Sequence, residues 1–284
     1  MHPIASPIAI VYNDTMTQPK KLAAVTGASD GLGKEFARQL AAEGYDLLVI
    51  ARRPTLLEKL KADLESQYGI QVEPIVCDLS KPDELKSLED RLENEESLEI
   101  LVNNAGFGLT DAFPNVDPDK EEAMIRVHVT ATMRLSRAAL VPMCKSKKGY
   151  VINLSSVAAF LFGSNSAEYI ATKAYILSFS KSLQCDVNRY GVRVQALCPG
   201  FTHTGFHSVE AMKAFDKGAT PRWLWLSAEF VVRTSLRSIR RTRRVVCVPS
   251  FRYKLILALV CNPVAQTLMA YLPGPGREEL EVRS

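Results

Sequence analysis

The sequence feature that most constrains the fold is a regular alternation, from Lys21 onward, of short apolar runs with longer amphipathic runs. Short apolar runs indicate buried strands and amphipathic runs indicate helices, so their alternation predicts a parallel sheet with helices on both faces. Strands are predicted over residues 21–26, 46–51, 72–77, 98–103, 150–155, 192–197 and 245–249. Helices are predicted over residues 32–43, 56–68, 82–94, 120–145 and 167–190.

Right-handed crossovers between these strands give a doubly wound α/β sheet of the Rossmann type, with seven parallel strands in the order 3-2-1-4-5-6-7. A ligand crevice is expected at the carboxyl ends of the strands. The 284 residues, 47% of them hydrophobic, suit one large domain, and no repeat or low-complexity linker divides it. We expect a flexible extension over 1–19, the Rossmann domain over 20–250 with a lid over the crevice at about 201–227, and a carboxyl-terminal helix and tail over 251–284.

Composition excludes several classes of function. A net charge of +4 is too small to indicate nucleic-acid binding, and the chain has neither zinc-finger spacing nor a basic stripe interleaved with aromatic residues. The six cysteines are scattered, so the sequence predicts no metal site and no disulfide framework, and it fits a reducing cytoplasm. The first 18 residues lack a basic stretch leading into an apolar core, so we do not expect a signal peptide.

A glycine-rich segment, TGASDGLG, joins the first predicted strand to the first predicted helix. Glycines allow a tight turn and close backbone approach, and a helix amino terminus presents N–H groups to a pyrophosphate. The G-x-x-x-G-x-G spacing differs from the dinucleotide fingerprint G-x-G-x-x-G, and a lone glycine cluster is more often a simple turn. The position between strand and helix favours a phosphate loop made of Gly27, Ala28, Ser29, Asp30, Gly31, Leu32 and Gly33.

Arg52 and Arg53 follow the second predicted strand, where an NAD-binding domain usually has an acidic residue that binds the ribose hydroxyls. A guanidinium there suits a 2′-phosphate, so NADP(H) is preferred over NAD, the alternative being that both arginines are solvated loop charges. Further cofactor contacts are expected after strands three and four. They are Asp78 and Leu79, then Asn104, Ala105 and Gly106 of the NNAG motif.

Tyr169 and Lys173 lie four residues apart in AEYIATKA, so they share one face of a helix. A phenol titrates near pH ~10 and is a poor acid or base at neutrality, but a nearby ammonium group is expected to lower its pKa. Ser156 follows the fifth predicted strand and precedes this pair. The Y-x-x-x-K spacing by itself is a common chance match, but with the serine and the phosphate loop it predicts a site for carbonyl or alcohol chemistry.

Five motifs stand in one order along the chain: TGASDGLG, NNAG, Ser156, Tyr169-x-x-x-Lys173 and Pro199-Gly200. Over about residues 21–249 the chain resembles a classical short-chain dehydrogenase/reductase. From TPRWLWL onward it is similar to DltE-like reductases and, more distantly, to 3-oxoacyl-CoA reductases and 17β-hydroxysteroid dehydrogenases. The resemblance implies that NADPH delivers hydride to a carbonyl carbon while Tyr169 protonates the oxygen. It also implies that Lys173 lowers the pKa of the tyrosine and binds the nicotinamide ribose, and that Ser156 donates a hydrogen bond to the same oxygen.

The resemblance further implies that Pro199, Gly200, the backbone of Thr202 and the hydroxyl of Thr204 hold the nicotinamide carboxamide. One position departs from the family pattern, because His128 in IRVHVTA stands where the family usually has an asparagine that anchors a water between the lysine and solvent. His128 either holds this water itself, which would add a pH dependence because imidazole titrates near ~6.5, or is a packed helix residue while the relay uses its backbone carbonyl.

Two regions bear on substrate and partners. Apolar residues crowd the expected lid and favour a hydrophobic ketone or oxoacyl substrate, although any one of them can instead pack the lid onto the body. They are Phe201, Phe206, Met212, Phe215, Trp223, Leu224 and Trp225. Residues 233–254 hold eight Lys or Arg and no acid, and the apolar run LILALV follows. This pattern suits an anionic lipid surface, or a solvated basic face beside a helix packed on the core or on another subunit, and the run is too short to span a bilayer.

The sequence thus predicts an NADP(H)-dependent reductase of a hydrophobic carbonyl compound, reversible in principle, with Tyr169 as general acid and base. The alternative is a non-catalytic NADP-binding sensor or scaffold on the same fold, which only His128 supports. Expected partners are a small carbonyl or alcohol substrate and further copies of the chain, in a homodimer or homotetramer formed through the two long helices. The expected location is the cytoplasm, with peripheral membrane contact as the alternative.

Overall fold

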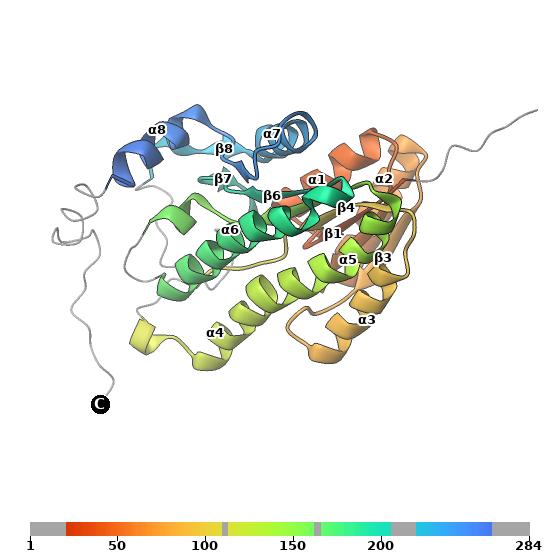
Figure 1. The fold of residues 1–284 in the computed structure, drawn as a ribbon. Helices are drawn as coiled ribbons and strands as arrows, with labels where there is room; N and C mark the ends of the chain where they lie inside the picture. The colour runs from red at the N-terminus through yellow and green to blue at the C-terminus, as the bar shows by residue number, and fades with distance from the viewer. Residues whose placement is uncertain (1–20, 110–112, 162–165, 206–219, 263–284) are drawn as a thin grey trace, which may run out of the picture.

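The computed structural model describes residues 21–109, 113–161, 166–205 and 220–262 (Figure 1). Seven parallel strands form one sheet in the order β3-β2-β1-β4-β5-β6-β9, which confirms the predicted fold class and strand order. These strands are β1 (Leu22–Thr26), β2 (Asp46–Ala51), β3 (Val72–Val76), β4 (Leu98–Asn103), β5 (Gly149–Leu154), β6 (Val192–Leu197) and β9 (Val246–Cys247). A short separate pair, β7 (Thr202–His203) and β8 (Leu226–Ser227), follows the sixth strand. The expected extension over 1–19, the lid residues Phe206, Met212 and Phe215, and the tail beyond residue 262 lie outside the described residues.

The helices begin where the sequence offers suitable first-turn residues. Proline fits the first helical position, because its missing N–H would be unpaired there anyway, and it opens α2, α3 and α4. This is why α2 begins at Pro54, two residues before the predicted start. The helices are α1 (Gly31–Ala42), α2 (Pro54–Tyr68), α3 (Pro82–Glu93), α4 (Pro118–Ile125), α5 (Thr132–Ser146), α6 (Ala167–Val187), α7 (Ala228–Arg241) and α8 (Phe251–Val260).

Two parts of the helical structure differ from the prediction. The single helix predicted over 120–145 is wrong in detail, because α4 and α5 are joined by a π-helical turn at Arg126–Ala131 that contains His128. Such a turn inserts one extra residue into the helix and has no reliable sequence signal. The prediction also lacks α7, although its buried residues Val231, Val232, Ser235, Leu236 and Ile239 follow the spacing of one helix face.

The sheet is covered on both faces, so its inner strands β1, β2 and β4 are almost entirely buried. Alternate residues of β1 point to opposite sides: Ala23 and Val25 pack with α1, α2 and α7, while Leu22 and Ala24 pack with α3 and α5. Figure 1 shows α5 and α6 side by side on the near face of the sheet, with α1 and α7 behind and above it. The carboxyl ends of the strands are therefore framed by helices from both layers.

A buried polar network ties two of these helices to the middle of the sheet. The side-chain amide of Asn103 at the end of β4 donates to Asn153 Oδ1 of β5 at 2.8 Å and to Ser136 Oγ of α5 at 3.0 Å. Asn153 Nδ2 in turn donates to Ser180 Oγ of α6 at 3.0 Å. Buried polar groups need such partners, so the network holds α5 and α6 in place at the end of the sheet where the candidate site lies.

Candidate active site

The glycine-rich segment forms a tight connection between β1 and α1. Asp30 caps the helix, because its side chain accepts a hydrogen bond of 2.7 Å from the N–H of Gly31. Gly33 packs so closely against this turn that an added Cβ would lie 2.2 Å from Gly27 O and 2.4 Å from Asn104 Nδ2. Only glycine fits there, and the helix amino terminus is left facing the crevice as a pyrophosphate site requires.

Thr26 is a structural part of this loop that sequence reasoning missed. Its hydroxyl accepts hydrogen bonds from the N–H groups of Asn104 and Ala105, both at 3.0 Å, and donates to Val102 O at 3.3 Å. The Asn104 side chain donates back to Thr26 O at 2.9 Å. Asn104 thus shapes the phosphate loop from the end of β4. The position of Thr26 directly before Gly27 is the sequence signal that could have identified it.

Of the two arginines after β2, Arg53 contacts the glycine-rich loop and Arg52 lies near Asp78. Arg53 Nη2 donates to Ser29 Oγ at 2.8 Å, which brings a guanidinium and a hydroxyl together beside α1. Asp78 follows β3 and accepts hydrogen bonds from both the N–H and the hydroxyl of Ser80. Partial burial acts against ionisation of Asp78, but the bonds from Ser80 and the charge of Arg52 lower its pKa below the usual value.

Ser156, Tyr169 and Lys173 meet at the carboxyl end of β5. Ser156 caps the short helix η3 (Val157–Phe160), and its hydroxyl is hydrogen-bonded to the hydroxyl of Tyr169. Lys173 Nζ donates to Leu154 O at 3.0 Å and lies 5.5 Å from the centre of the Tyr169 ring. The neighbouring Ser155 instead donates to the carbonyl of Lys173 at 2.8 Å, so its hydroxyl is already engaged with the backbone of α6.

Burial dominates the ionisation of this pair. It raises the pKa of Tyr169 above its usual value, and the hydrogen bond with Ser156 offsets this only in part. It also lowers the pKa of Lys173 to about 7. The sequence argument expected Lys173 to lower the pKa of Tyr169, but in this structure the loss of solvation is the larger effect for both groups. Tyr169 is therefore held in its protonated form at neutral pH, which is the form that can donate a proton.

The buried lysine is expected to cost stability in a pH-dependent way. Between pH about 7, where Lys173 titrates when folded, and ~10.4, where a free lysine titrates, the unfolded chain binds more protons than the folded chain. Stability then rises with pH, by up to ~1.4 kcal/mol per pH unit for one group. Urea unfolding of the wild type and of Lys173→Met at several pH values in this range should show a more positive slope in the wild type. Equal slopes would contradict the lowered pKa.

His128 lies in the π-helical turn with both ring nitrogens occupied by protein groups. Nε2 accepts from the N–H of Phe107 at 3.1 Å, and Nδ1 lies 2.9 Å from Thr172 Oγ1. Because the Thr172 hydroxyl donates to Tyr169 O at 2.8 Å, the proton on the His128 ring belongs on Nδ1. The ring is a neutral bridge from the loop after β4 to helix α6, which carries Tyr169 and Lys173.

This geometry favours the second of the two alternatives for His128, a packed helix residue. The side chain is 1% exposed, and burial, followed by the charge of Lys173, holds its pKa well below the usual value. A ring that stays neutral and has both nitrogens engaged has no free nitrogen for a bound water. Thr172, which sequence reasoning did not single out, is the partner that completes this bridge.

The segment after β6, residues 199–204, lies against the same site. The N–H of Val157 donates to Pro199 O at 3.0 Å, so the Pro199-Gly200 turn lies directly beside Ser156. Thr202 is buried and donates to Gly200 O at 2.9 Å. Thr204 packs against Gly31 of the phosphate loop. The segment thus bridges the glycine-rich loop and Ser156, the two places that the predicted dinucleotide would have to reach at once.

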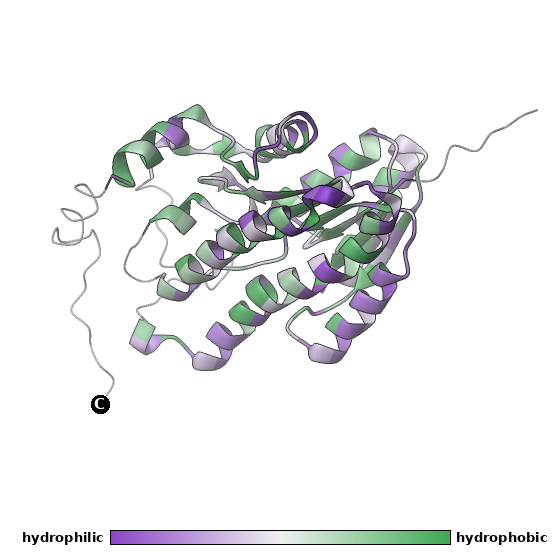
Figure 2. Cartoon of the chain, viewed as in Figure 1, coloured by the Kyte–Doolittle hydropathy of each residue, from purple (hydrophilic) through white to green (hydrophobic). Residues whose placement is uncertain are grey.

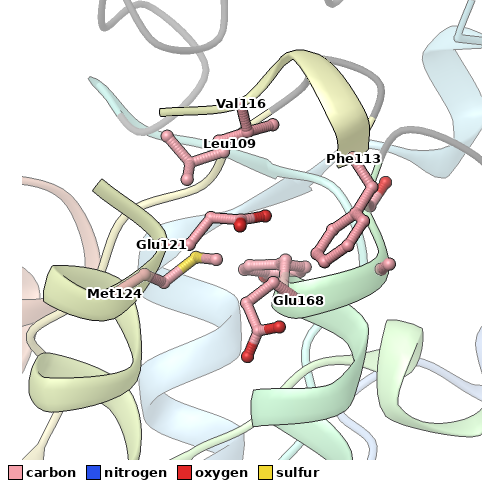
Figure 3. Close-up of a pocket in the computed structure, with 9 residues that line it drawn as sticks. Leu109, Phe113, Val116, Glu121, Met124 and Glu168 are labelled. Carbon is pink, nitrogen blue, oxygen red and sulfur yellow. The ribbon is translucent and has the colours of Figure 1, made fainter. Parts of the chain in front are cut away.

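A shallow recess lies next to Tyr169. Figure 3 shows that Leu109, Phe113, Val116 and Met124 form its apolar lining, from the loop after β4 and from α4. Two acidic residues, Glu121 and Glu168, also line the recess. Loss of solvation and the charge of Glu168 raise the pKa of Glu121. The recess therefore offers a largely apolar surface beside Tyr169.

Two features are absent from the part of the chain that the structure describes. No group of three or more His, Cys, Asp or Glu side chains is placed to hold a metal ion within residues 21–109, 113–161, 166–205 and 220–262. In the same ranges no helix has both the length and the apolar character needed to cross a bilayer.

Known proteins resemble this chain in both sequence and structure. A family model described as short chain dehydrogenase matches residues 21–213. A very-long-chain 3-oxoacyl-CoA reductase from Danio rerio is 33% identical over 76% of this chain and 69% of its own length. A reductase of the same name from Pyrenophora tritici-repentis is 31% identical over 68% of this chain, which spans 58% of that longer protein.

Solved structures of dehydrogenases are similar to this chain over most of its length. A short-chain dehydrogenase from Sphingobium yanoikuyae in complex with NADPH has a TM-score of 0.77 and 28% identity, over 91% of this chain and 98% of its own. A bulky-bulky ketone specific alcohol dehydrogenase from Comamonas testosteroni has a TM-score of 0.73 and 25% identity, over 94% of this chain and 100% of its own.

Proposed function

This chain belongs to the short-chain dehydrogenase family, and from that membership we propose that it reduces a hydrophobic ketone or 3-oxoacyl compound with NADPH. It is an NADP-dependent oxidoreductase. The observation that carries the proposed reaction is the meeting of Ser156, Tyr169 and Lys173 beside the phosphate loop and the recess. When bound, NADPH supplies the hydride, and the chain's own residues orient the carbonyl and supply the proton.

Each residue of the site has a distinct task in this proposal. Tyr169 donates its phenolic proton to the carbonyl oxygen, and its raised pKa keeps that proton in place until charge develops there. The Ser156 hydroxyl, which is hydrogen-bonded to the Tyr169 hydroxyl in this structure, donates instead to the same oxygen once substrate is bound and stabilises the developing negative charge. Lys173 is buried beneath the tyrosine ring and, with a pKa of about 7, can exchange a proton near neutral pH.

The apolar lining of the recess supports a hydrophobic carbonyl compound as the substrate. Leu109, Phe113, Val116 and Met124 offer apolar contacts to an alkyl or ring system whose carbonyl lies at Tyr169. Glu121 and Glu168 would repel an anionic group held at the same place. A 3-oxoacyl thioester would then place its apolar chain in the recess and its charged carrier outside it.

The direct test of the proposed function has two stages. NADPH binding is measured first, by quenching of tryptophan fluorescence. NADPH oxidation is then followed at its absorbance maximum with a panel of bulky ketones, aldehydes and 3-oxoacyl thioesters. Turnover of at least one hydrophobic member is expected. Binding of NADPH without oxidation by any member would favour the alternative, a non-catalytic sensor or scaffold.

Cofactor selection provides an independent prediction. Arg53→Ala removes the guanidinium that reaches Ser29, and a charge-assisted contact to phosphate contributes about 1.5–3 kcal/mol. KM for NADPH should therefore rise by about tenfold to 100-fold, because 1.4 kcal/mol corresponds to tenfold, while KM for NADH changes little. Arg91→Ala, which removes a guanidinium paired with Glu95 and Glu73 away from the loop, is the matched control. An equal rise for both cofactors would contradict a 2′-phosphate site.

The hydrogen bonds of His128 to Phe107 and Thr172 predict that replacing His128 changes the reaction rate but not its pH dependence. His128→Asn shortens the side chain, so it can no longer reach both Phe107 N–H and Thr172 Oγ1. We expect kcat to fall about tenfold, since small misplacements of catalytic groups have effects of this order, with an unchanged pH profile. Thr172→Val, which removes the partner hydroxyl but keeps the shape of the side chain, should act similarly. An acid limb near pH ~6.5 that disappears in His128→Asn would instead indicate a titrating relay.

The assembly and location of the enzyme stay predictions. A homodimer or homotetramer through α5 and α6 is supported by Met133 and Tyr175, each 38% exposed on those helices. The cytoplasm remains the expected compartment for an enzyme that uses NADPH and has scattered free cysteines.

A further inference from the structure

Helix α8 carries an exposed apolar stripe on the outside of the molecule. Phe251, Leu255 and Leu259 are 77%, 54% and 65% exposed and recur every four residues, so they share one side of the helix. Tyr253 and Leu257 on the other side are buried against the body. Figure 2 shows most of α8 in green, the colour of hydrophobic residues. A helix with apolar residues toward both the body and the outside normally packs against a second apolar surface, so the stripe indicates a binding surface.

The helix is held firmly beside the active site. The Tyr253 hydroxyl accepts from the N–H of Phe201 at 2.9 Å and donates to Leu224 O at 2.8 Å. Its ring packs on Gly200 so closely that a Cβ at Gly200 would lie within 1.9 Å of it. The helix also contacts η3, the segment that Ser156 caps. The exposed stripe is thus a fixed surface next to the catalytic segments.

Positive charge accompanies the stripe. Arg252 and Lys254 are exposed on α8 among the apolar positions, and Arg222 is exposed in η7 (Arg222–Leu224). Arg252 Nη1 donates to Trp223 O at 2.7 Å, which places the 54% exposed Trp223 side chain in the segment bound to α8. No acidic residue occurs in 220–227 or 250–262. These two segments therefore present a cationic edge around an apolar and aromatic centre.

We propose that this α8 surface, formed by Trp223, Phe251, Leu255 and Leu259 with Arg252 and Lys254, docks on an anionic lipid bilayer. The apolar side chains enter the boundary between headgroups and acyl chains, Trp223 lies at the interface, and the cations contact anionic headgroups. The ten residues of α8 reach about 15 Å, half of the ~30 Å hydrocarbon core, so the helix lies on the membrane.

A second copy of the chain is a poorer occupant on electrostatic grounds. A symmetric dimer joins the same patch of both subunits, so it would bring Arg252 and Lys254 of each copy close to their own counterparts. Juxtaposed like charges at an interface cost several kcal/mol. An anionic bilayer instead complements the charge of the whole surface.

Vesicle flotation of the full chain tests the proposal without any turnover, so its outcome does not depend on the proposed reaction. Binding is expected to vesicles that contain phosphatidylglycerol, to be absent with phosphatidylcholine alone, and to weaken as salt is raised. Leu255→Glu combined with Leu259→Glu should lower the partition coefficient at least tenfold, and Lys254→Glu by a smaller factor. Both leucines are exposed, so circular dichroism should show an intact fold. Leu56→Glu, at a 38% exposed position on α2 near the other edge of the sheet, should bind as the wild type does.

Several results would overturn the proposal. One is the absence of flotation with phosphatidylglycerol vesicles, and another is undiminished flotation of the double glutamate variant. If the full chain does not bind but a chain ending at Asn262 does, the surface belongs to residues 263–284. If light scattering shows that the double variant breaks an oligomer while no form binds lipid, the surface belongs to a second copy.

Discussion

Replacing Tyr169 with Phe is expected to lower kcat for carbonyl reduction by about 10³-fold, the middle of the range for loss of a general acid. Phenylalanine keeps the ring that meets His128 edge-on at 6.0 Å, so the site should remain folded. It lacks the hydroxyl that is hydrogen-bonded to Ser156 and that donates the proton. Stopped-flow oxidation of NADPH in a single turnover measures this step, and fluorescence titration should show unchanged NADPH binding.

The matched control lies on the same helix. Tyr175→Phe removes a phenolic hydroxyl from a 38% exposed position where the ring stacks on Phe179, and kcat should stay at the wild-type value. Ser156→Ala should lower kcat by about 10²-fold, as expected for loss of one hydrogen bond to a developing oxyanion. A Tyr169→Phe variant as fast as the wild type would mean that another group donates the proton.

Replacing Gly33 with Ala is expected to abolish useful cofactor binding, with Kd for NADPH raised about 100-fold or more. The added methyl would lie 2.2 Å from Gly27 O and 2.4 Å from Asn104 Nδ2. Neither neighbour can move freely, because both belong to the hydrogen-bonded connection between β1 and β4. Overpacking of this kind costs about 1–3 kcal/mol, so Tm should also fall by several degrees. Isothermal titration with NADPH and a thermal melt measure the two effects.

Gly69→Ala is a control that distinguishes a loss of stability from a loss of NADPH binding at the phosphate loop. Gly69 caps α2 in the left-handed region, with φ of 66°, and an added Cβ would meet nothing within 4 Å. Alanine there strains the backbone and should lower Tm, but it should leave Kd for NADPH unchanged. If Gly33→Ala lowers Tm without weakening NADPH binding, the glycine-rich segment is a structural turn and not a phosphate loop.

The sequence predicted the sheet better than the helices, and the reason is physical. Buried parallel strands such as β2 and β4 are continuous apolar runs with a clear signal, so all seven strands and their order are confirmed. Helix interruptions depend on backbone geometry, and nothing in the side chains of Arg126–Ala131 marks a π-helical turn. The spacing of apolar residues in α7 is visible in the sequence and could have predicted this helix.

In the candidate site, too, the sequence predicted some features and could not predict others. Spacing placed Tyr169 and Lys173 on one helix face, and the structure brings both to Ser156. Spacing could not give the sign of the pKa shifts, because burial outweighs the charge of the lysine only once the chain is folded. The contacts of His128 with Phe107 and Thr172 join segments far apart in sequence, so no local pattern contains them.

The central claim is that this chain transfers hydride from NADPH to a carbonyl carbon. The most direct measurement incubates the enzyme with NADPH deuterated at the transferable position of the nicotinamide and with the best hydrophobic ketone of the panel, then locates the deuterium by mass spectrometry and NMR. The account predicts one deuterium on the carbinol carbon of a single alcohol enantiomer, formed by the wild type and about 10³-fold more slowly by Tyr169→Phe. Tight NADPH binding with no deuterated alcohol from any member of the panel would contradict it.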